Sequence, residues 1–102
     1  MSACGTSPEE RAAARAVDAC IAALEPVAER RPPSSAVLQA AAAEAEGAAR
    51  TDDHWEVLAG VLRRAADTAG TPEGDAAVAA VVDECRQSRD FVRRGGRPPD
   101  GA

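Results

Sequence analysis

Apolar residues recur three and four positions apart along most of the chain, the spacing that places them on one face of an α-helix. No stretch alternates apolar and polar residues in the manner of a β-strand. Helix start and stop signals divide the pattern into four segments. The sequence therefore predicts a small all-α protein, either a four-helix bundle with short loops or a three-helix core whose first helix is kinked by proline.

The first predicted helix opens with Ser7-Pro8-Glu9-Glu10, where a serine cap precedes a proline at the first helical position and a glutamate follows three residues after the cap. Pro26 interrupts this helix, so it either kinks at Glu25 or stops before a short turn that continues to Arg31. Its apolar residues form one stripe that we expect to be buried: Ala13, Val17, Cys20, Ile21, Leu24, Val27 and Ala28.

The second predicted helix follows the stiff connector Pro32-Pro33-Ser34-Ser35 and carries almost no bulky side chains. Residues 40–43 offer only methyl groups, and Gly47 extends this smooth strip. Such a strip lets another backbone approach closely. It is either a consequence of the Ala-rich composition or a docking groove for a partner helix, and on the second interpretation Ala41 and Ala45 are candidate partner-binding residues.

The third predicted helix starts at the cap Thr51-Asp52-Asp53, where acidic residues favour a helix N-terminus, and it ends at Gly70. Its apolar face contains Trp55, Leu58, Ala59, Leu62, Ala65, Ala66 and Ala69. Thr71-Pro72 repeats the opening seen at Ser7, so we expect a fourth helix from there to Gly95-Gly96. Its stripe contains Val78, Val81, Val82, Cys85 and Val92, with Phe91 beside it.

These elements predict one helical domain over residues 8–94, with a flexible N-terminus at 1–7 and a disordered Arg/Pro/Gly tail at 95–102. The chain has no apolar run long enough to span a membrane and no export signal at its N-terminus. We therefore expect a cytoplasmic protein without a membrane partner.

The interior is expected to be thin, because the 102 residues include 26 alanines but only 15 Leu, Ile, Val and Phe. Large side chains contribute most of the free energy of burial, so a monomer would be only marginally stable. A protein partner or self-association would supplement this core.

All twelve basic residues are arginine, a bias that we attribute to a GC-rich bacterial genome.

The densest group of chemically versatile side chains is Asp52-Asp53-His54-Trp55. Neighbouring residues on a helix point in different directions, so this group is explained by a capped helix start with Trp55 anchored in the core. A role for His54 and Trp55 in binding a small ligand, or for His54 in binding a metal, is the alternative. Trp55 is also a candidate partner-binding residue. The sequence contains no catalytic motif, and we expect no catalysis by the chain itself, no catalytic residue, no cofactor and no metal.

The three cysteines, Cys4, Cys20 and Cys85, lack the paired spacing of a zinc site or a disulfide framework. Cys20 and Cys85 each lie on an apolar stripe, so we expect buried, inert thiols. A cross-link between these two cysteines is geometrically allowed but disfavoured in a reducing cytosol.

Charge is distributed unevenly along the chain. Residues 1–85 carry a net charge of −8, whereas residues 86–102 carry +3. The C-terminal arginines either complement a helix dipole or bind carboxylates or phosphates on another molecule, and the candidates are Arg89, Arg93, Arg94 and Arg97. Nucleic acid is not expected, because the acidic body would repel phosphates and one Trp with one Phe gives no stacking platform.

The sequence thus favours a non-catalytic helical module for protein–protein interaction, either a small accessory subunit of a larger complex or a homo-oligomer. Head-to-tail assembly, with the basic end of one copy on the acidic body of the next, is one form of the second case. Two alternatives stay open: a bundle that binds a small ligand or metal near His54 and Trp55, and a regulator of the antitoxin or anti-sigma type.

Overall fold

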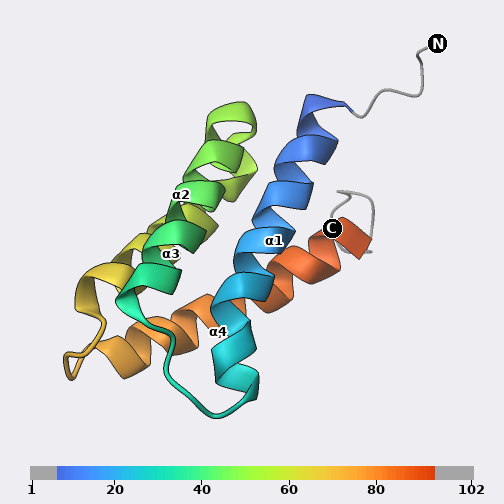
Figure 1. Ribbon diagram of the computed structural model, residues 1–102. Coiled ribbons are helices and arrows are strands. Elements are labelled where there is room, and N and C mark those ends of the chain that lie inside the picture. The colour runs from blue at the N-terminus through green and yellow to red at the C-terminus, as the bar shows by residue number, and fades with distance from the viewer. Residues whose placement is uncertain (1–6, 94–102) are drawn as a thin grey trace.

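The computed structural model describes residues 7–93 and shows four α-helices joined by short connections (Figure 1). The helices are α1 (Pro8–Ala28), α2 (Ser35–Thr51), α3 (Glu56–Thr68) and α4 (Gly74–Arg93), and one turn of 3-10 helix, η1 (Asp53–Trp55), precedes α3. These residues contain no strand. The prediction of an all-α four-helix bundle is confirmed.

Of the segments that were predicted to be flexible, residues 1–6 and 95–102 lie outside the described part of the chain, as do Cys4, Arg94 and Arg97. Between residues 7 and 93, no helix combines the length and the apolar character needed to cross a membrane.

The four helices do not contact each other equally. α2 packs against both α1 and α3, and α3 packs against α4. α4 crosses the other helices at a steep angle and reaches α1 over a smaller interface (Figure 1). The C-terminal half of α4 therefore lies beside the middle of α1, with Cys85 buried, Phe91 partly buried and Val92 exposed.

α1 begins as the sequence predicts, with a capping box. The Glu10 backbone N–H donates to Ser7 Oγ at 3.1 Å, and the Ser7 N–H donates to Glu10 Oε1 at 2.9 Å. Pro8 occupies the first helical position, where its missing N–H costs nothing.

Pro26 does not break α1, which continues through it to Ala28. The proline lies in the last turn, so its missing N–H removes only one hydrogen bond from the helix. The chain then turns because the N–H groups of Glu29 and Arg31 both donate to the Pro26 carbonyl, at 3.0 and 2.8 Å. The alternative of a three-helix core with a broken first helix is therefore wrong.

The buried face of α1 differs from the stripe that the sequence predicts. The helix buries mainly alanines, namely Ala12, Ala16, Ala19 and Ala23, together with Cys20. The bulkier stripe lies to one side, with Val17 and Leu24 half-buried and Ile21 60% exposed. Two alanine faces can approach more closely than two bulky ones, which favours this orientation of α1 and α2.

The smooth strip of α2 supplies the other half of this interface. Ala41 and Ala45 are buried inside the chain's own core, along with Leu38, Ala42 and Ala48. Their prediction as partner-binding residues is therefore not supported by their position, because α1 and α3 already cover that side of α2. The largest fully buried side chains belong mainly to other elements and are Trp55, Leu38, Leu58, Leu62 and Val81.

Surface ion pairs join the helices around α2. Arg15 of α1 contacts Glu44 at 3.0 Å, and its guanidinium lies over Gly47. Arg63 of α3 makes two hydrogen bonds with Glu46, at 3.0 and 2.9 Å, and this pairing lowers the pKa of the Glu46 carboxyl below its usual value. Both pairs are partly exposed, so each contributes little to the free energy of unfolding.

α4 begins two residues later than the Thr71-Pro72 signal indicates. The Thr71 hydroxyl does not cap α4 but donates back to the Thr68 carbonyl at 2.6 Å, and the first helical residue is Gly74. Gly70, two residues after the end of α3, has a φ of 81°, a conformation that glycine adopts without steric cost. Gly74 is also required by packing, because a Cβ there would lie 2.8 Å from the Thr68 carbonyl oxygen.

Candidate functional site

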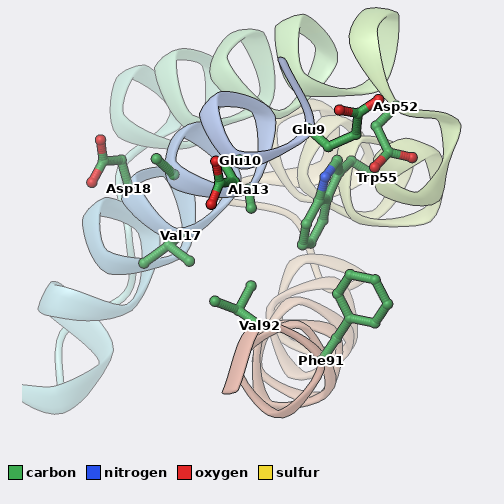
Figure 2. A pocket seen from close by; sticks show the side chains of 10 residues that line it. Glu9, Glu10, Ala13, Val17, Asp18, Asp52, Trp55, Phe91 and Val92 are labelled. Carbon is green, nitrogen blue, oxygen red and sulfur yellow. The ribbon is translucent and has the colours of Figure 1, made fainter. Parts of the chain in front are cut away.

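A depression of about 680 Å³ lies between the N-terminal half of α1, the 3-10 turn η1 with its cap Asp52, and the end of α4 (Figure 2). We call it the acidic pocket. Its lining comprises Glu9, Glu10, Ala13, Ala14, Val17, Asp18, Asp52, Trp55, Phe91 and Val92. The walls are thus apolar and aromatic, and every charged side chain among the lining residues is a carboxylate.

Helical spacing accounts for the α1 wall of the acidic pocket. Ala13 and Val17 are four residues apart and share one face, and Glu9 is four residues before Ala13. Asp52 is placed by its own capping role, because its carboxylate accepts a hydrogen bond from the His54 N–H at 3.0 Å. The carboxylates of the pocket therefore come from two segments that lie far apart in the sequence.

Three aromatic rings form a cluster at one side of the acidic pocket. His54 stacks on Phe91, with ring centroids 3.7 Å apart and an interplanar angle of 19°. Trp55 meets both rings edge to face, at 4.7 Å from His54 and 5.7 Å from Phe91. The stacking brings His54 into contact with α4, although its side chain is exposed and is not part of the pocket lining.

Trp55 is the largest buried side chain, only 1% exposed, and its indole Nε1 has no hydrogen-bond partner among residues 7–93. Figure 2 shows the indole standing between α1 and α4, with its nitrogen on the edge that faces Ala13. A buried N–H without an acceptor is unfavourable, so a hydrogen-bond acceptor that reached this indole N–H from the pocket would be stabilised there.

A second depression, of about 330 Å³, adjoins the first and runs between α1 and α4. We call it the α1/α4 groove. Its lining comprises Val17, Cys20, Ile21, Leu24, Cys85, Ser88, Arg89, Val92 and Arg93. Val17 and Val92 belong to both depressions, so the two meet along these side chains.

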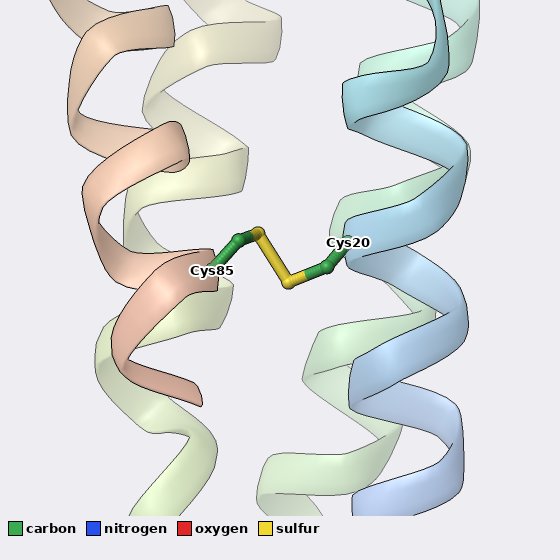
Figure 3. The surroundings of a disulfide bond; sticks show 2 residues. All are labelled: Cys20 and Cys85. Atoms are coloured by element: carbon green, nitrogen blue, oxygen red, sulfur yellow. A yellow bond between two sulfur atoms is a disulfide. The ribbon is translucent and has the colours of Figure 1, made fainter. Parts of the chain in front are cut away.

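Cys20 and Cys85 form a disulfide at the bottom of the α1/α4 groove, with their Cα atoms 5.7 Å apart (Figure 3). The expectation of two separate reduced thiols is therefore wrong for this structure. The crossing of α4 over α1 brings the two apolar stripes together at these positions, which their separation of 65 residues does not reveal. The disulfide ties together two helices whose interface is smaller than those of α1 with α2, α2 with α3 and α3 with α4.

The sequence-predicted site residues separate into distinct places. Arg89 and Arg93 are exposed on the α4 wall of the groove, whereas Arg94 and Arg97 lie outside the described residues. Trp55 lines the acidic pocket. Across the described part of the chain, no three His, Cys, Asp or Glu side chains are close enough to hold a metal ion together.

Sequence reasoning missed the residues that form both depressions. The stripe of Val17, Ile21 and Leu24 was assigned to the core, and the acidic residues beside Trp55 were not recognised as a group. A signal was present in the sequence, because α1 carries an alanine stripe next to the bulkier one, and two apolar stripes on one helix indicate two different surfaces.

Comparison of the chain with protein-family models, curated proteins and solved structures gives no match.

Proposed function

We propose that the protein is a protein–protein interaction module that pairs with a second copy of itself through the α1/α4 groove. The observation that carries this proposal is the apolar surface of the groove. Ile21 is 60% exposed and Val92 is 37% exposed, and they adjoin the half-buried Val17 and Leu24. A contiguous apolar patch beside charged residues is typical of an interaction surface.

The charges beside the groove favour a second copy as the occupant. Asp18 and Glu25 flank Ile21 on α1, three residues before it and four after it, so one edge is acidic. Arg89 and Arg93 make the opposite edge, on α4, basic. None of these four side chains has an ion-pair partner within residues 7–93.

A surface with one acidic and one basic edge is complementary to itself under two-fold symmetry. A two-fold axis along the groove places α1 of each copy over α4 of the other. Asp18 and Glu25 of one copy then meet Arg89 and Arg93 of its partner, twice in the dimer, and the apolar side chains are buried between them. Head-to-tail assembly joins the same charges only once per contact.

The composition of the core is consistent with this pairing. Most of the buried apolar residues are alanines, so a monomer removes little apolar area from water. Pairing through the groove adds the bulkier side chains of α1 to a shared interior and stabilises the folded state by mass action.

A cytoplasmic accessory subunit, as predicted from the sequence, remains a prediction. The disulfide between Cys20 and Cys85 is relevant to the predicted location, because the cytosol keeps most thiols reduced. Association should therefore be measured in both the oxidised and the reduced protein.

Sedimentation velocity over a range of protein concentrations tests the pairing. We expect the parent chain to shift from monomer to dimer as its concentration rises, and Ile21→Glu to remain monomeric. Val57→Glu is the matched control, because Val57 is also 60% exposed but lies on α3 outside the groove. A parent chain that is monomeric throughout, or equal effects of the two substitutions, would contradict the proposal.

Reversing the charges at the two edges of the groove tests whether α1 of one copy lies over α4 of the other. The variant with Arg89→Glu and Arg93→Glu has two acidic edges, and the variant with Asp18→Arg and Glu25→Arg has two basic edges. Each should dimerise poorly alone, whereas an equimolar mixture should form heterodimers because every acidic edge then meets a basic one. Failure of the mixture to associate rules out the proposed arrangement.

A further inference from the structure

We propose that the acidic pocket binds a small organic cation, namely an alkyl guanidinium or alkyl ammonium compound that also carries a carbonyl group. This inference goes beyond the pairing of two chains and rests on different observations. They are the buried, unpaired indole N–H, the ring of carboxylates and the apolar walls of the pocket.

The carboxylates make the acidic pocket attractive to positive charge. Glu9, Glu10, Asp18 and Asp52 line it, and the lining contains no basic side chain. Glu10 and Asp52 each use an oxygen in helix capping, whereas Glu9 and Asp18 have no hydrogen bond or ion pair to any of the residues 7–93. Like-signed groups around a low-dielectric wall concentrate the negative potential there.

The spread of these carboxylates favours an extended cation over a metal ion. In Figure 2, Asp18 and Asp52 lie on opposite sides of the pocket, and Glu9 and Glu10 lie between them. A metal ion needs several oxygen ligands within about 2.6 Å, and no three acidic side chains of the described chain meet that need together. A guanidinium or ammonium on a flexible chain can instead interact with one or two carboxylates at the rim.

The walls fit the apolar part of such a ligand. Ala13, Val17 and Val92 offer aliphatic surface, and the rings of Trp55 and Phe91 add aromatic surface. An alkyl chain can lie along these groups while its charged end stays near solvent and carboxylates. An aromatic face also attracts a cation placed over it.

The indole N–H of Trp55 determines which polar group the ligand must carry. Nε1 of Trp55 can only donate a hydrogen bond, so the ligand must present an acceptor. The acceptor should be a neutral amide carbonyl, because the carboxylates of the pocket would repel an anion. N-acetylarginine amide carries a guanidinium, an alkyl chain and two carbonyl groups, and is therefore the probe. N-acetylcitrulline amide is its neutral isostere and serves as the matched control ligand.

Fluorescence titration provides a direct readout, because Trp55 is the chain's one tryptophan. We expect N-acetylarginine amide to change the emission of Trp55 in a saturable way at low salt, and the citrulline compound to leave it unchanged. Glu9→Gln should weaken binding roughly fivefold, the effect of removing one exposed charge pair. Glu73→Gln is the control, because Glu73 is also exposed at a helix N-terminus but lies outside the pocket.

Calorimetry with Trp55→Phe then tests the N–H itself, since this change keeps an aromatic ring and removes the donor. Binding should again weaken. No saturable response to the arginine compound, equal responses to both compounds, or equal effects of Glu9→Gln and Glu73→Gln would overturn the proposal. Repeating the titration in the Ile21→Glu variant separates it from the pairing proposal, because Asp18, Val17 and Val92 then meet no second copy and the pocket should still bind the cation.

Discussion

The disulfide between Cys20 and Cys85 should contribute a large part of the stability of this protein. It closes a loop with a sequence separation of 65 residues, and the loss of chain entropy in the unfolded state for such a loop corresponds to about 4 kcal/mol at 25 °C. A whole domain of this size is stable by only about 5–15 kcal/mol. We therefore expect the variant with Cys20→Ala and Cys85→Ala to lose about 4 kcal/mol of unfolding free energy.

Loss of the disulfide should destabilise α4 more than the other helices. This helix meets α1 over the smallest of the main interfaces, and part of the apolar surface between them is open to solvent. Without the covalent link, little else holds the C-terminal half of α4 beside α1. Loss of the disulfide should therefore also weaken dimerisation, because both walls of the α1/α4 groove depend on that crossing.

Urea unfolding, followed by circular dichroism, measures the difference between the oxidised parent and the double variant. A Cys4→Ser background removes the third thiol and prevents disulfide exchange. Both proteins should be compared at one fixed concentration, because association also stabilises the folded state. A difference below about 1 kcal/mol, with both proteins fully folded, would refute the reasoning that the cross-link compensates for a weak core.

Three further predictions concern substitutions at single positions. Gly60→Ala should raise the unfolding free energy by about 0.5–1 kcal/mol, because Gly60 lies within a helix and no atom lies within 4 Å of a Cβ placed there. Gly74→Ala should lower it, because the new Cβ would lie 2.8 Å from the Thr68 carbonyl, and urea unfolding showing the same sign for both changes would contradict this packing argument. Glu46→Gln should slightly destabilise the protein at neutral pH: the Arg63 pairing lowers the Glu46 pKa, so its contribution is present above the usual value of 4.5 and is lost as the pH falls through the lowered pKa. Unfolding curves of parent and variant should therefore converge in acid, and a difference that grows there would show that the carboxylate is not stabilised by Arg63.

Local signals in the sequence were sufficient to predict most of the secondary structure. Ser7 caps α1 as predicted, Asp52 caps the 3-10 turn that precedes α3, and Gly70 follows the end of α3 by two residues. These features depend on residues that are neighbours in the chain, so local rules are sufficient to find them. The buried face of α3 was also correct, because Leu58 and its companions form its one broad apolar stripe.

Which apolar stripe of α1 is buried depends on how the helices pack together. Local periodicity cannot distinguish an alanine face from a bulkier face beside it, and the choice follows from the close approach that α2 allows. The steep crossing of α4 then left Ile21 and Val92 exposed, brought Cys20 to Cys85, and placed Phe91 against Trp55 and the carboxylates of α1. The groove and the pocket are made of residues from distant segments, so their existence depends on how helices pack and not on any run of sequence.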